Sequence, residues 1–131
     1  LDGILIESMI TNAILELMVG LRRDPLFGLV LTIASGGVMT EILKDASTVL
    51  VPTDNISLQS AIDSLRIAPL FNGFRGGQAA SRTAVLDQIK CLVSLMDGAP
   101  DIIETEINPM MVGTDYACCA DALISTSSTA A

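Results

Sequence analysis

Short apolar runs, separated by glycines, prolines and charged turns, fill the first fifty residues of the chain. Runs of this length and spacing predict strands that are buried on at least one face. We predict strands over residues 3–9, 13–22, 28–35, 38–43 and 46–51. The segment 13–22 is rich in Leu and Met and also suits a helix, so both structures stay open there. Gly36 and Gly37 break the third strand from the fourth, and Pro52 closes the fifth.

The pattern changes to a helical period after Pro52. Thr53 or Asp54 can cap a helix that runs to about Arg66. Ser81 can cap a second helix that runs to about Asp97. The inward stripe of the first helix is predicted to contain Leu58, Ala61, Ile62 and Leu65, and that of the second Val85, Ile89, Leu92, Val93 and Met96. Residues 68–80, between the helices, are rich in Pro and Gly and predict a loop.

The last third of the chain predicts a hairpin. A strand over residues 101–112 places Glu104, Glu106 and Asn108 on one face, and Ile103, Thr105 and Ile107 on the other. Residues 113–116 predict a tight turn and residues 116–124 the returning strand. The order of strands, two helices and strands predicts an α+β domain over residues 1–124, mainly an antiparallel sheet with two packed helices. The Ser/Thr/Ala tail, residues 125–131, is expected to be disordered.

The row of oxygens on the penultimate strand is unusual for a buried element. Neighbouring carboxylates repel one another unless a cation lies among them, and hard oxygen ligands suit Mg²⁺. If Thr114 and Asp115 form a two-residue loop, the hairpin register places Asn108 opposite Asp121. One cation could then contact both side chains. Thr-Asp is not a preferred loop of this kind, and a slip of one residue would turn Asp121 to the other face.

Composition narrows the classes of function. A formal charge of −8 and only three Phe, one Tyr and no Trp argue against nucleic-acid binding. The apolar runs are broken within about ten residues, which is short for a membrane span. Three Cys without a disulfide pattern suggest a reducing cytoplasm. The chain contains no His, so it lacks the commonest general base and phosphoacceptor.

Several motifs along the chain, taken together, resemble one family. They are Ile4-Leu-Ile-Glu7, Glu16-Leu-Met-Val-Gly20, Arg23-Asp-Pro-Leu-Phe-Gly28, Gly36-Gly37 with Glu41 and Asp45, Phe74-Arg-Gly76, Glu106-Ile-Asn-Pro109 and Asp121-Ala122. Their order is similar to that in the NDP-forming acyl-CoA synthetases, relatives of succinyl-CoA synthetase with an ATP-grasp domain. The resemblance covers nearly the whole chain except the tail. It implies the C-terminal part of the ATP-grasp domain.

The resemblance also implies roles for individual residues. Glu7, Ser8 and Met9 match the hinge segment that contacts the nucleotide base, and Glu16 matches the residue that contacts the ribose. Asn108 and Asp121 match the two Mg²⁺ ligands, the same two residues that the hairpin register brings together. In relatives, the residue matched by Glu106 lies near the phosphate and the phosphorylated His and is implied to be catalytic. The implied cofactors are Mg²⁺ and ATP/ADP.

The implied reaction converts acyl-CoA, ADP and phosphate to carboxylate, CoA and ATP through a phosphohistidine. This chain lacks the phosphoacceptor, so the resemblance implies a fragment that is inactive alone. Its implied partners are the remaining ATP-grasp half and the CoA-binding and phosphohistidine domains of the same cytoplasmic ligase.

The sequence departs from the family pattern at two positions. Ser35 precedes Gly36-Gly37 where the family usually has Gly-x-Gly-Gly, and Leu123 takes the place of a common Arg. An alternative is therefore a non-catalytic, regulatory synthetase-like module of a protein lysine acetyltransferase. A third interpretation is a free-standing α+β domain that binds a metal or a partner.

Overall fold

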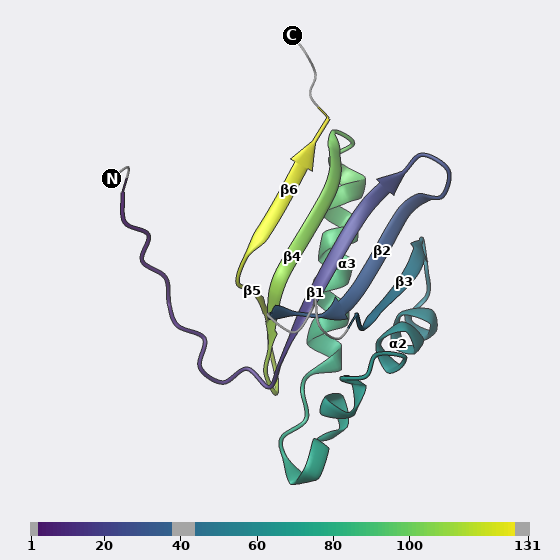
Figure 1. Ribbon diagram of the computed structural model, residues 1–131. Helices are drawn as coiled ribbons and strands as arrows, with labels where there is room; N and C mark the ends of the chain where they lie inside the picture. Colours follow the sequence, from purple (N-terminus) through teal and green to yellow (C-terminus); the bar gives the residue numbers. More distant parts are fainter. Residues whose placement is uncertain (1–2, 38–43, 128–131) are drawn as a thin grey trace.

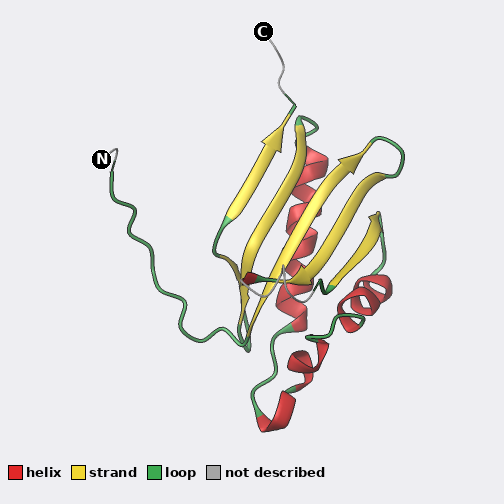
Figure 2. Ribbon diagram, viewed as in Figure 1, coloured by secondary structure: helices red, strands yellow, loops and turns green. Residues whose placement is uncertain are grey.

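One antiparallel sheet forms the body of the molecule (Figures 1 and 2). The computed structural model describes residues 3–37 and 44–127. The sheet order is β3-β2-β1-β4-β5, and β6 also pairs with β4. The strands are β1 (Leu15–Asp24), β2 (Gly28–Ser35), β3 (Ala46–Val51), β4 (Ile102–Val112), β5 (Ala117–Cys119) and β6 (Ala122–Thr126). The segment that suited either a strand or a helix is thus the strand β1.

Two α-helices lie against one face of the sheet. They are α2 (Asn55–Asp63) and α3 (Arg82–Gly98), with the short 3₁₀ helices η2 (Ala68–Asn72) and η3 (Phe74–Gly76) between them. Figure 2 shows α3 crossing behind the central strands, with α2 beside β3. The core forms between this sheet face and the helices; its fully buried members include Leu17, Val19, Leu31, Ile33, Ile62, Val85, Ile89 and Met96. The predicted α+β class is confirmed.

The predicted caps of both helices are confirmed. The Asp54 side chain accepts from the backbone N–H of Ser57, and the Ser81 hydroxyl accepts from that of Ala84. The helix α2 ends at Asp63, whereas the sequence predicted that it would continue to about Arg66. The buried carboxylate of Asp45 accepts the backbone N–H of Arg66 at 2.8 and 2.9 Å and the hydroxyl of Ser35 at 2.7 Å. That N–H is therefore bound to the β2–β3 connection and not to a helical carbonyl.

A β-bulge interrupts β4. Leu17 and Val19 of β1 pair with Met110 and Ile107 of β4, so β4 has one extra residue between these pairs. Asn108 follows the buried Ile107 by ordinary alternation and lies on the face away from the helices. Because of the extra residue, Met110 and not Pro109 is the next side chain in the core. A second irregularity, in the pairing with β6, lies between Ile102 and Glu104. Ile102 packs against the core and Ile103 is 42% exposed, so the prediction that Ile103 shares the apolar face is wrong.

The predicted strand over residues 3–9 is wrong for this structure. Its backbone makes no ladder, and Ile4, Leu5 and Ile6 are 83–89% exposed. A strand needs a neighbouring edge for its N–H and C=O groups, and no described strand lies alongside this segment. The predicted strand 38–43 falls outside the described residues.

The end of the sheet lies beyond the predicted domain boundary at residue 124. Ser125 and Thr126 belong to β6, and the backbone N–H of Ser127 donates to Asp101. Residues 128–131 lie outside the described residues, so their predicted disorder stays a prediction. None of the helices in residues 3–37 and 44–127 is long and apolar enough to cross a membrane.

Candidate functional site

The sheet face away from the helices carries the polar residues of the candidate site. Glu104, Glu106 and Asn108 project from β4 with half-buried side chains. A shallow hollow of about 240 Å³ lies over this face, lined by residues of β1, β2 and β4 that include Arg22, Thr32, Glu104 and Glu106. Gly20 of β1 lies directly opposite Glu106, and Met18 and Arg22 of β1 also line the hollow. Glu106 is therefore accessible from the hollow.

The predicted hairpin register is confirmed. The backbone N–H of Asn108 donates to the carbonyl of Asp121 at 3.1 Å, and the flanking pair Ile107–Ala122 has the same register. The N–H of Gly113 donates to the carbonyl of Tyr116 at 3.0 Å, which closes the two-residue loop. Directly opposed residues of antiparallel strands point to the same face. Asn108 and Asp121 are thus opposite one another in the backbone of the hairpin.

Both side chains of this pair retain acceptor capacity. The Asn108 Oδ1 accepts from the N–H of Gly37 at 3.2 Å, and a carbonyl oxygen has a second lone pair. The Asp121 Oδ1 accepts from the N–H of Ala122 at 2.8 Å. Its other carboxylate oxygen has no hydrogen bond within residues 3–37 and 44–127. Two hard oxygen donors of this kind fit Mg²⁺, which is commonly held by one or two protein groups plus substrate phosphates and water.

Asn108 and Asp121 are the two protein ligands on which the proposed Mg²⁺ site depends. Among the described residues, no group of three or more His, Cys, Asp or Glu side chains could hold a metal. The site is therefore a partial one, which leaves most coordination positions to ligand oxygens. That arrangement differs from a structural metal site, where the protein supplies nearly every ligand.

Gly36 and Gly37 join β1 and β4 at the same end of the face. The N–H of Gly36 donates to the carbonyl of Glu16 at 2.8 Å. A Cβ on Gly36 would overlap the backbone of Leu17, and a Cβ on Gly37 would overlap the Glu16 carboxylate. Gly37 also has a positive φ of 66°. The two glycines are thus required by a close backbone approach, which brings Glu16 beside the amide that holds Asn108.

The hinge residues lie at the same end, but on an exposed segment. Glu7, Ser8 and Met9 line a hollow of about 360 Å³ together with Met111 of β4 and residues 118–120. Met111 lies directly opposite Glu16 across β1 and β4. The structure therefore places the Glu16 carboxylate beside Gly37, whose amide binds Asn108, and pairs the backbone of Asn108 with that of Asp121. Glu106 lies two residues before Asn108 on β4. Met111 and the amide of Gly37 were not among the predicted site residues. The Gly36-Gly37 pair in the sequence was the one signal for the Gly37 amide.

Known proteins with similar sequences are CoA ligases. A family model described as an ATP-grasp domain matches residues 1–126. Trans-feruloyl-CoA synthase from an unknown prokaryotic organism is 36% identical over 112 residues, which are 86% of this chain and 16% of that protein. The β subunit of ADP-forming acetate–CoA ligase II of Pyrococcus furiosus is 31% identical over 111 residues, 84% of this chain and 47% of that protein.

Solved structures show the same likeness. The apo form of the acetyl-coenzyme A synthetase 1 of Ca. Korarchaeum cryptofilum superposes with a TM-score of 0.82 at 27% identity, covering 92% of this chain and 57% of that one. The same enzyme in complex with coenzyme A and Mg-AMPPCP gives a TM-score of 0.80 at 28% identity, over 86% of this chain and 53% of that one. This chain spans less than half the length of the curated relatives described above. The chain belongs to the ATP-grasp domain family.

Proposed function

We propose that this chain is the nucleotide- and Mg²⁺-binding lobe of an NDP-forming acyl-CoA synthetase. The enzyme would convert acyl-CoA, ADP and phosphate to carboxylate, CoA and ATP through a phosphohistidine. The observation that carries the proposal is the backbone pairing of Asn108 with Asp121 beside β1, the strand that carries Glu16. The relatives support it, because they include ADP-forming acetate–CoA ligases and a structure that holds Mg-AMPPCP.

Different residues of the open face bind different parts of the nucleotide and its metal ion in this proposal. Asn108 Oδ1 and the Asp121 carboxylate hold Mg²⁺, which neutralises phosphate charge when bound. Glu16 accepts hydrogen bonds from ribose hydroxyls, and the hinge segment, Glu7 to Met9, contacts the base. Gly37 keeps its amide on Asn108 and so fixes the orientation of that ligand. The hollow over β1 and β4 supplies space beside these groups.

We expect Glu106 to be the carboxylate that a phosphohistidine meets as it approaches the phosphates. Its half-buried carboxylate lines the hollow opposite Gly20, which has no side chain of its own. A carboxylate at this position can accept the ring N–H of an incoming imidazole and fix which nitrogen receives the phosphoryl group. The imidazole must come from another segment, since this chain has no His.

Other parts of the enzyme complete the site. We infer that they are the remaining ATP-grasp half and the CoA-binding and phosphohistidine domains, working in the cytoplasm. The exposed aliphatic side chains of Ile4, Leu5 and Ile6 support this inference, because they suit a strand that pairs with another sheet. The matching relatives are ligases, which does not favour the regulatory acetyltransferase module as an alternative.

The test is substitution of the two Mg²⁺ ligands in the complete enzyme. Asn108→Ala and Asp121→Ala should each reduce Mg²⁺-dependent turnover on the order of a hundredfold, because each removes a ligand that stabilises phosphate charge. Ser125→Ala is the matched control, since Ser125 lies on β6 opposite Glu104 but away from the ligand pair. Circular dichroism should be unchanged in all three variants. Wild-type turnover in both ligand variants would refute the assignment.

A further inference from the structure

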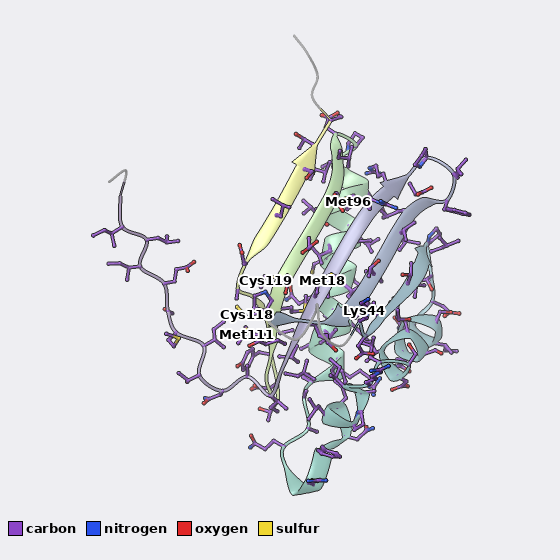
Figure 3. All side chains as sticks on the ribbon, viewed as in Figure 1. Met18, Lys44, Met96, Met111, Cys118 and Cys119 are labelled. Carbon is purple, nitrogen blue, oxygen red and sulfur yellow. The ribbon has the colours of Figure 1, made fainter. Side chains whose placement is uncertain are left out.

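Ser35 and Asp45 join the two ends of the segment between β2 and β3. The backbone N–H of Ser35 donates to the carbonyl of Asp45 at 3.0 Å, and the Ser35 hydroxyl donates to the Asp45 carboxylate at 2.7 Å. Both residues are buried, with exposed fractions of 3% and 8%. Figure 3 shows Lys44, the residue before Asp45, where β2 ends and β3 begins. Two hydrogen bonds therefore hold Ser35 and Asp45 together inside the fold.

The Asp45 carboxylate is also held by a third segment of the chain. Its two oxygens accept the backbone N–H of Arg66 at 2.8 and 2.9 Å, beyond the end of α2. Hydrogen bonds to an ionised acceptor are stronger than those between neutral groups. These bonds fix the orientation of the carboxylate, and the position of Ser35 is thus tied through Asp45 to the helical layer.

Ser35 is followed directly by the two glycines of the candidate site. The N–H of Gly36 donates to the carbonyl of Glu16 at 2.8 Å, and the N–H of Gly37 donates to Oδ1 of Asn108 at 3.2 Å. Glycine is conformationally permissive, so the two glycines do not fix the direction of their own amides. A fixed Ser35 on their N-terminal side limits where the Gly37 amide can point.

The Gly37 amide determines which end of the Asn108 carboxamide faces it. A carboxamide has one oxygen, which accepts hydrogen bonds and binds cations, and one NH₂ group, which does neither. The Gly37 N–H donates to Oδ1 and so holds the oxygen end in place. Without that donor, rotation about the last side-chain bond would exchange the two ends. The hydrogen bond therefore orients the residue that we proposed as a Mg²⁺ ligand.

We propose that Ser35 and Asp45 are positioning residues for the Mg²⁺ ligand Asn108. The inference rests on the proposed function, because it takes Asn108 as a ligand. The connection begins at the Arg66 N–H and passes through the Asp45 carboxylate to the Ser35 hydroxyl. From Ser35 it continues along the backbone to the Gly37 amide, which binds Asn108. Residues that orient a metal ligand in this way affect metal affinity although they do not contact the ion.

The experiment measures the Mg²⁺ dependence of the complete enzyme. Ser35→Ala should raise the Mg²⁺ concentration for half-maximal turnover roughly fivefold, the factor that corresponds to one hydrogen bond of ordinary strength. Its turnover at saturating Mg²⁺ should stay close to that of wild type. Asp45→Asn should act in the same direction, because it removes the charge that strengthens both bonds. Ser64→Ala is the matched control, since the Ser64 hydroxyl also makes a 2.7 Å bond, to the carbonyl of Ala61.

Hydrogen exchange in the metal-free enzyme supplies a readout that is independent of activity. The Gly37 amide should exchange roughly fivefold faster in Ser35→Ala than in wild type, because its bond to Asn108 opens more often. Ser64→Ala should leave that rate unchanged, and circular dichroism checks that both variants retain the fold. An unchanged rate at Gly37 in Ser35→Ala would overturn the proposal. An equal acceleration in Ser64→Ala would overturn it too, since general destabilisation would then explain the effect.

A double variant separates this inference from the proposed function. If Ser35 acts through Asn108, Ser35→Ala should not change the Mg²⁺ requirement further in the Asn108→Ala background. An equal change in both backgrounds would overturn the positioning role. A wild-type Mg²⁺ requirement in Ser35→Ala, together with an impaired Asn108→Ala, would overturn this inference and leave the proposed function standing. Wild-type Mg²⁺ dependence in Asn108→Ala would instead overturn both.

Discussion

The two faces of the sheet differ although the same strands form both. Along β1, Leu17, Val19 and Leu21 point to the helices and are at most 1% exposed. Glu16 and Met18 alternate with them on the open face, where the side chains are exposed or half-buried. The period of two along a strand thus separates two sets of positions.

The difference assigns separate tasks to the two faces. The helix-covered face carries the buried apolar area that stabilises the fold. The open face carries the oxygen donors and the hollow over β1, β2 and β4. Substitutions on the covered face should therefore change stability, and those on the open face should change binding and turnover with little effect on stability.

The largest effect should come from the covered face. Leu17→Ala should lower the free energy of unfolding by about 2–5 kcal/mol, because it removes a fully buried side chain and leaves a cavity. Met18→Ala, one residue away on the open face, should cost less than about 1.5 kcal/mol. Urea unfolding of both variants measures the difference. If the two variants lost the same free energy of unfolding, the open face would contribute as much to stability as the covered face, contrary to this prediction.

A buried polar group should rank next. Asp45→Ala should lower the free energy of unfolding by about 1–3 kcal/mol, since it leaves the Ser35 hydroxyl and the Arg66 N–H without their acceptor. Asp45→Asn retains one acceptor oxygen and should cost less. Thermal denaturation followed by circular dichroism compares the two variants. A smaller loss for alanine than for asparagine would contradict this account of the carboxylate.

An open-face carboxylate should give a much smaller change in stability. Glu106→Gln should alter the free energy of unfolding by no more than about 0.5 kcal/mol, because its side chain is only half-buried and accepts no hydrogen bond from residues 3–37 and 44–127. In the complete enzyme the same change should reduce formation of the phosphohistidine, measured with radiolabelled ATP. If Glu106→Gln were destabilised but formed the phosphohistidine normally, Glu106 would serve stability and not catalysis, which would contradict the prediction.

The smallest effect concerns the pH dependence of α2. Hydrogen bonds from the backbone N–H and the side chain of Ser57 lower the pKa of Asp54 below its ordinary value of 3.8. A carboxyl whose pKa is lowered by folding stabilises the fold above the ordinary pKa, and this contribution is lost as the pH falls through the lowered value. Melting temperatures should fall less steeply with acid in Asp54→Asn, because Asn caps without titrating. Identical acid profiles would contradict the prediction.

Local signals in the sequence predicted the covered face well. The bounds of β2 and β3 match the predicted strands, and Asp54 and Ser81 cap the helices as expected. The register of Asn108 with Asp121 was also predictable, because a short loop fixes every pair above it. These features depend on neighbours in the chain or on a strict period.

Contacts between distant residues were not predictable in the same way. Arg23 is half-buried and donates to the carbonyls of Met96 and Ile102, two contacts that nothing near it in the sequence indicates. The bulge at Asn108 and Pro109 appears only when β1 is paired with β4. The strand expected over residues 3–9 pairs with none of the described strands. The roles of the site residues remain predictions.

The uncovered stretch from Ile4 to Ile6 has a practical consequence for handling the protein. Three consecutive aliphatic residues of high β-propensity, freely accessible and without a proline among them, form a template for intermolecular cross-β association. Concentrated preparations of this chain should precipitate or form soluble aggregates. A lysine in place of Leu5 would act as a gatekeeper and keep the preparation monodisperse.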